Sequence, residues 1–185
     1  MTVASFGDPQ RPVEVSGEIR AEEPRDGFVT WGVLLAQLNV GRILAPIDSP
    51  VMAQFVARIA DVNRQAETAP GFVWRLQDDE GEGALDQRIF NDDTLLVNMS
   101  VWRDAASLFD FVYRNLQHRE ALQQRRQWFS AVAEPMVVCW WTPDTHMPTI
   151  RDAEERLTHV RENGPSARAF PFRRVIPDEY QFLEP

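Results

Sequence analysis

The sequence contains no lysine, because all 19 of its basic residues are arginine. It therefore has no P-loop lysine to bind phosphates, and no amine to form a Schiff base with pyridoxal phosphate or an aldolase substrate. Its single cysteine, Cys139, excludes an intrachain disulfide and any zinc or iron–sulfur site that draws several cysteines from one chain. These absences remove several large classes of enzyme from consideration.

Basic charge is also scarce, since 28 acidic residues outnumber the arginines and give a formal net charge of −9. A nucleic-acid-binding protein needs a basic surface to displace counterions, so we expect no nucleic-acid partner. No apolar run reaches the length of a membrane span, and the first residues show no signal-peptide pattern. We expect a cytoplasmic protein without a membrane partner.

The chain has the length of one ordinary domain. Residues 1–30 are acidic and lack sustained apolar periodicity, so they predict an extension that is either a disordered tail or an arm across a dimer partner. Residues 31–185 predict a single α+β domain. The acidic loop at 78–83 does not match the calcium-loop pattern, and we interpret it as solvated charge rather than a metal site.

Apolar content, capping residues and breakers place strands and helices in alternation along residues 31–185. Ser49–Pro50 predicts a helix start, Pro70–Gly71 its end, and Thr149 with Asp152 a capping box. The predicted strands are 33–40, 72–77, 95–102, 136–141 and a last one at 169–174. The predicted helices are 49–70, 104–129 and 149–164, and the long one at 104–129 is either continuous or broken near Leu116–Gln117. This order favours one antiparallel sheet with helices on one face.

Side chains alternate across a strand, so each strand offers two lists of residues. In the first strand, Leu34, Ala36, Leu38 and Val40 form the face that we expect beneath the helices. The opposite faces of three strands are enriched in polar groups: Gln37, Asn39, Arg75, Gln77, Asn98, Ser100 and Trp102. Such a surface is compatible with solvent, with a ligand cavity or with a buried dimer face.

Aromatic and titratable residues add further candidates. Trp74 and Trp140 lie in predicted strands, and because Trp140 and Trp141 are adjacent they must point to opposite faces. On the long helix, His118 and Arg125 share a face with apolar residues. His118 is therefore a candidate for a buried structural histidine, a general base, a proton shuttle or an axial metal ligand. Arg125 is a candidate for binding an anion.

Several blocks of this sequence resemble the domain of unknown function 3291 family, over about residues 33–175. The blocks are Leu35–Asn39, Pro70–Leu76, Val97–Trp102, Phe111–Tyr113, His118–Arg119, Arg126–Phe129, Trp140–Trp141, His146–Thr149 and Gly164–Pro165. That family is similar to the dimeric α/β barrel superfamily, which includes the antibiotic-biosynthesis monooxygenases. The resemblance implies a ferredoxin-like sheet, a second sheet packed face to face in a homodimer, and a pocket between sheet and helices.

Some members of that superfamily oxidise polycyclic aromatic substrates without a cofactor, and others bind haem. The haem-degrading members use an asparagine, a tryptophan and a histidine on elements similar to those that carry Asn39, Trp102 and His118 here. The spacing between the tryptophan and the histidine departs from theirs. The resemblance thus implies an enzyme that needs no cofactor, with haem binding as an alternative.

Together these observations predict a homodimeric enzyme of specialised metabolism, of monooxygenase or cyclase type, acting on a small, largely apolar, polycyclic molecule. The alternative is a protein that binds such a molecule or haem without catalysis. The predicted catalytic residues are His118, Asn98, Arg75 and Trp102. The predicted substrate-binding residues are Gln37, Asn39, Trp74, Ser100, Arg125 and Trp140. The amides, Arg75 and Trp102 would orient the substrate or stabilise developing oxyanion charge, and His118 or Arg125 would handle a proton or an anion.

Overall fold

Four antiparallel strands form one sheet in the order β2-β3-β1-β4. The computed structural model describes residues 32–78, 81, 83–114 and 124–174. The strands are β1 (Val33–Arg42), β2 (Phe72–Arg75), β3 (Leu95–Trp102) and β4 (Val137–Pro143). Helices lie between β1 and β2 and between β3 and β4 along the chain. This is the ferredoxin-like α+β arrangement, as expected, with β1 and β3 as the two inner strands.

The sheet has two faces that differ in chemistry, because the register aligns side chains of like kind across the strands. We call the polar one face A and the other face B. Face A carries Leu35, Gln37 and Asn39 of β1, Asn98, Ser100 and Trp102 of β3, Arg75 of β2, and Val137, Cys139 and Trp141 of β4. Face B carries Ala36, Leu38, Val40, Val97, Met99, Val101, Val138 and Trp140, all buried.

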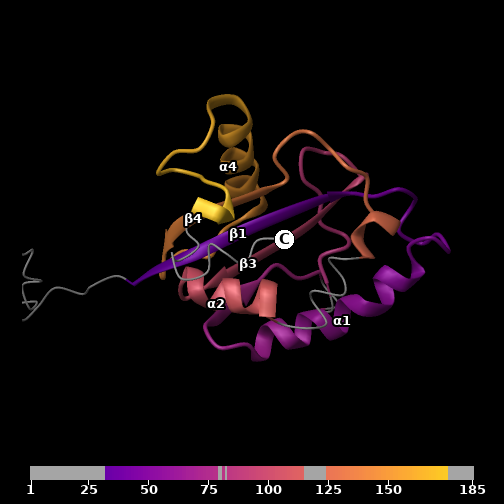
Figure 1. Ribbon diagram of the computed structural model, residues 1–185, viewed down its shortest axis with the longest axis horizontal. Coiled ribbons are helices and arrows are strands. Elements are labelled where there is room, and N and C mark those ends of the chain that lie inside the picture. Colours follow the sequence, from indigo (N-terminus) through magenta and orange to yellow (C-terminus); the bar gives the residue numbers. More distant parts are fainter. Residues whose placement is uncertain (1–31, 79–80, 82, 115–123, 175–185) are drawn as a thin grey trace, which may run out of the picture. The chain divides into compact units, whose positions relative to one another are not determined.

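Face B is covered by α4 (Ile150–Asn163), which buries Ala153, Leu157 and Val160 against it. Figure 1 shows α4 on one side of the sheet, with α1 and α2 on the other. The first strand's apolar face was expected beneath the helices of one layer, and this prediction needs correction: α4 alone packs there. The reason is that face B is apolar across three strands, so it requires a cover of its own.

Face A carries α1 (Ala53–Thr68) and α2 (Ala105–Phe109). Helix α1 begins at Ala53, not at Ser49–Pro50 as predicted. Ser49 lies in a turn, and its buried hydroxyl makes no hydrogen bond that would cap a helix. The predicted end is confirmed: α1 stops at Thr68, and Gly71 adopts φ +81°. A side chain at Gly71 would also collide with Ser107 of α2, so both the positive φ and the lack of space require glycine at this position.

The long helical region predicted at 104–129, with a break near Leu116–Gln117 as its alternative, is described only at its two ends. Asp104 caps α2 as expected, since its Oδ1 accepts the Ser107 N–H at 2.7 Å. The helix then widens into the π-helix η1 (Asp110–Arg114), and the 3-10 helix η2 (Arg125–Gln127) follows further along the chain. Residues 115–123 lie outside the described residues, as does the predicted extension at 1–30.

The last predicted strand, 169–174, is reduced to one residue. Phe170 exchanges two backbone hydrogen bonds with Cys139 of β4, at 2.7 and 2.9 Å. Pro171 follows, and the chain then turns into the 3-10 helix η3 (Phe172–Arg174), where the Arg174 N–H donates to the Pro171 carbonyl.

The capping box at the start of α4 is confirmed, with reciprocal hydrogen bonds between Thr149 and Asp152. Gly164, at φ 74°, ends that helix. In the described part of the chain, no helix is both long and apolar enough to cross a membrane.

Candidate functional site

Two asparagines face each other in the middle of face A. Asn39 on β1 and Asn98 on β3 are register partners, and both side chains are exposed. This position is unusual, because β1 and β3 are inner strands and asparagine is disfavoured in strands. The asparagine pair contributes no apolar burial to the core. Two exposed amides at this position are compatible with solvent, with a ligand or with a dimer face.

Exposed apolar side chains share face A with the asparagine pair. Asn39 is also the register partner of Val137 on β4, which is 36% exposed. On the same face, Val33 is 59% and Trp141 is 44% exposed. The described side chains that lie open on face A are therefore uncharged, and they combine amides with apolar walls. Ligand sites for small molecules have this composition.

A hydrogen-bond chain runs beside the asparagine pair. The Nε1–H of Trp102 donates to Oγ of Ser100 at 2.9 Å, and the Ser100 hydroxyl donates to Oε1 of Gln37 at 3.2 Å. Trp102 is 1% and Ser100 7% exposed, whereas Gln37 is half-buried. Gln37 and Ser100 are register partners, so the chain crosses from β3 to β1 towards the open part of face A.

Aromatic rings hold Trp102 in place. Phe72 meets it edge-on with ring centroids 5.5 Å apart, and Phe111 of η1 stacks on it at 5.2 Å. Nearby on the same face, burial raises the pKa of the Cys139 thiol to about 12, so this group stays protonated and neutral. The rings give the site a rigid apolar wall, because edge-on and stacked aromatic pairs constrain each other's orientation.

Arg75 is buried on the same face and is bound to protein partners. Its Nε lies 2.7 Å from Oε1 of Glu67 on α1, and its Nη2 donates to the Gly81 carbonyl at 2.6 Å. Its Nη1 donates to the Leu76 carbonyl at 3.4 Å. Arg75 therefore clamps β2 to α1 and to the acidic loop, and this geometry gives it a positioning role.

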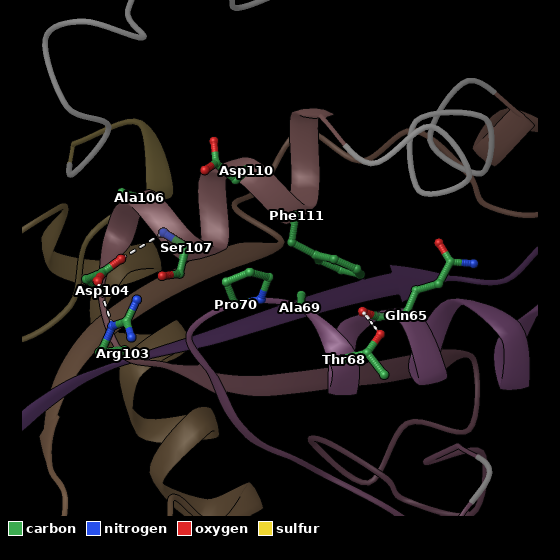
Figure 2. Close-up of a pocket in the computed structure, with 10 residues that line it drawn as sticks. All are labelled: Gln65, Thr68, Ala69, Pro70, Arg103, Asp104, Ala106, Ser107, Asp110 and Phe111. Atoms are coloured by element: carbon green, nitrogen blue, oxygen red, sulfur yellow. Dashed lines mark hydrogen bonds and ion pairs between the residues drawn. The ribbon is translucent and has the colours of Figure 1, made fainter.

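A cavity of about 540 Å³ lies between the end of α1 and the start of α2. Figure 2 shows Phe111 facing this space, with Arg103 and Asp104 at the other end. Burial alone would raise the pKa of Asp104, but hydrogen bonds from Ser107 and the pairing with Arg103 hold it below its usual value. Because Phe111 also stacks on Trp102, one ring borders both the cavity and the hydrogen-bond chain.

The structure brings together six of the predicted site residues and separates the others. Gln37, Asn39, Arg75, Asn98, Ser100 and Trp102 share face A. Trp74 and Trp140 lie on face B, within or against the core cluster there, and so not on the same face as these six. Arg125 lies on the exposed turn η2. His118 lies outside the described residues, and its roles as base or haem ligand stay predictions.

Sequence reasoning missed three contributors to this face: Glu67, Phe72 and the stacking role of Phe111. Simple alternation groups Phe72 with Trp74, but a β-bulge between them puts Phe72 beside Trp102 instead. The position of Glu67 could have been predicted from the sequence. The tight Pro70–Gly71 turn reverses the chain, so the last turn of α1, which contains Glu67, lies beside β2.

Three solved structures are similar to this chain over about three fifths of its length. SnoaB, a cofactor-independent oxygenase from Streptomyces nogalater, is 17% identical, with 63% of this chain and 95% of that chain covered and a TM-score of 0.39. A conserved protein from Methanosarcina mazei Go1 is 10% identical, with coverages of 60% and 92% and a TM-score of 0.39. PA3566 from Pseudomonas aeruginosa is 13% identical, with coverages of 63% and 97% and a TM-score of 0.37.

No curated protein matches the sequence significantly. The profile described as Domain of unknown function (DUF3291) matches residues 34–182, which include every described helix and, apart from Val33, every described strand. The chain therefore belongs to the DUF3291 family.

Proposed function

We propose that face A binds a small, largely apolar molecule and acts on it as an enzyme of oxygenase or cyclase type. The observation that carries the proposal is the exposed asparagine pair, Asn39 and Asn98, on the two inner strands and beside the exposed Val137. Amide N–H groups fixed on strands can hold a carbonyl oxygen and stabilise it as negative charge develops. Strands position such donors more rigidly than loops do.

The substrate must supply much of the chemistry itself. Among the described residues, the open part of face A presents amides and apolar groups, and its one thiol is neutral and buried. A polycyclic ketone or phenol suits this surface, because its rings can contact the apolar side chains and its oxygen can accept hydrogen bonds from the amides. Such a molecule can also ionise to an enolate or phenolate. Such an anion can react with O₂ or close a ring, and no cofactor is needed in the proposal. His118 stays a candidate for removing the proton.

The homodimer remains part of the proposal. Val33 and Trp141, which are 59% and 44% exposed on face A, are the apolar side chains that we expect a second copy to cover. Native mass spectrometry of the purified protein, with an absorbance spectrum, tests this: a dimer supports the proposal, a monomer contradicts it, and a Soret band would favour the haem alternative.

Anthrone provides a direct assay of the enzyme proposal. It ionises to an enolate and reacts with O₂ to give anthraquinone and water, a change that absorbance follows. We expect turnover by the wild type and a loss of about tenfold or more in Asn39→Ala and Asn98→Ala, as for the loss of one hydrogen bond to a charged group. Asn163→Ala, at the end of α4, is the matched control. Equal rates in all three variants would contradict the proposal.

A further inference from the structure

The hydrogen-bond chain Gln37–Ser100–Trp102 has only one consistent direction. An indole nitrogen can donate but cannot accept, so Oγ of Ser100 must be the acceptor at 2.9 Å from Nε1 of Trp102. The hydroxyl proton of Ser100 then needs another acceptor, because buried polar groups are almost always hydrogen-bonded. Oε1 of Gln37 lies 3.2 Å away and meets that need.

The opposite orientation of the Gln37 amide would leave a buried proton without an acceptor here. If Nε2 of Gln37 faced Ser100, the hydroxyl would accept from both neighbours and lose the partner for its own proton. Ser100 is 7% exposed, so water is a poor substitute. The chain therefore turns the Gln37 oxygen towards Ser100, so that the two N–H groups of this amide face away from Ser100.

We propose that Ser100 is a positioning residue that makes Gln37 a fixed hydrogen-bond donor, so that the site selects ligands presenting an acceptor oxygen over matched ligands without one. The inference rests on the proposed function and names the ligand chemistry of the same site: a ketone, enolate or phenolate oxygen. Without Ser100 the amide of Gln37 can turn, and it then presents its oxygen as readily as its nitrogen.

The test uses two probes of nearly the same shape. 1-Tetralone and tetralin differ only in that one ring CH₂ of tetralin is a carbonyl in 1-tetralone. Their dissociation constants are measured by ligand-observed NMR with the full-length protein. We expect the wild type to bind 1-tetralone about tenfold more tightly than tetralin, which is the usual size of one well-made hydrogen bond.

The variants separate a positioning role from a merely structural one. Ser100→Ala should reduce the preference to about twofold or less, and Ser100→Thr, which keeps the hydroxyl, should restore it. Gln37→Glu removes the donor, so it should favour 1-aminotetralin, a cation, over 1-tetralone. If Ser100→Ala weakens both probes equally and leaves their ratio unchanged, Ser100 is structural and the inference is wrong.

Three further outcomes are also decisive. Urea unfolding checks that Ser100→Ala is folded; if it is not, Gln37→Met tests the donor without touching the buried hydroxyl, and an unchanged probe ratio in it overturns the inference. If the wild type binds both probes equally, and Asn39→Ala weakens both, the ligand site stands while the selection for an acceptor is refuted. If the wild type binds neither probe, the proposed function fails together with the inference.

Discussion

Replacing Arg75 by methionine should destabilise the fold by about 2–3 kcal/mol, because the variant lacks the hydrogen bonds that clamp β2 to α1 and the acidic loop. Arg75 is 8% exposed and donates to Glu67, Gly81 and Leu76. Each hydrogen bond to a charged group contributes about 1.5–3 kcal/mol, but the variant also no longer buries a guanidinium, which offsets part of the loss. Methionine fills a similar space, so the cavity term is small.

Glu67→Gln isolates the charge of the same pair. The side chain of Glu67 is 36% exposed, so solvent screens the interaction and the expected loss is smaller, about 1 kcal/mol. The double variant should then show a coupling energy of about 1 kcal/mol between the two residues. Urea unfolding at neutral pH measures all four proteins, with the midpoint changing and the m-value constant.

A loss below about 0.5 kcal/mol in Arg75→Met, with no coupling to Glu67, would refute the clamp, since surface substitutions without a role fall in that range. The anthrone assay then decides what Arg75 does. A variant of undiminished stability that lacks turnover would return Arg75 to the catalytic role predicted from the sequence.

Three other predictions concern single positions. Asp104→Ala should destabilise the fold by about 1 kcal/mol, because α2 loses its N-cap. The pKa of Asp104 is lower in the folded state, so the cap contributes fully above the unfolded-state pKa of about 4 and is lost as the pH falls through the folded-state pKa. The urea midpoints of variant and wild type should therefore converge in acid. Persistence of the full difference in acid would refute it. Gly41→Ala should destabilise by about 1–3 kcal/mol, because its Cβ would lie 2.6 Å from the Phe129 ring; an unchanged thermal midpoint would show that the ring moves freely. Cys139, whose thiol is buried with a pKa of about 12, should react with a thiol reagent only on unfolding, and rapid labelling of the folded protein would contradict its burial.

The strands and caps were predictable because their signals are local. The apolar alternation of β1 and β3 and the Thr149–Asp152 box each depend on residues close in sequence, and the structure confirms them. The polar face was also predictable, because Gln37 and Asn39 alternate with buried residues. That six predicted site residues share face A follows from this alternation together with the strand register.

The remaining features depend on contacts between distant segments. The alternation of apolar and polar residues does not predict that α4 covers face B. It also does not predict the β-bulge that puts Phe72 on face A and Trp74 on face B. The direction of the Gln37–Ser100–Trp102 chain needs the register of β1 and β3, which no local pattern contains. The change from α2 to the π-helix η1 likewise has no sequence signal that we can identify.

The central claim is that Asn39 and Asn98 contact a ligand on face A. Side-chain amide resonances in a ¹H–¹⁵N spectrum, recorded while 1-tetralone is added, test this most directly. The account predicts that the Asn39 and Asn98 amide signals shift with one common dissociation constant, while the amide of Asn163 on α4 stays in place. Binding that shifts other signals and leaves both of these asparagines unchanged would contradict it.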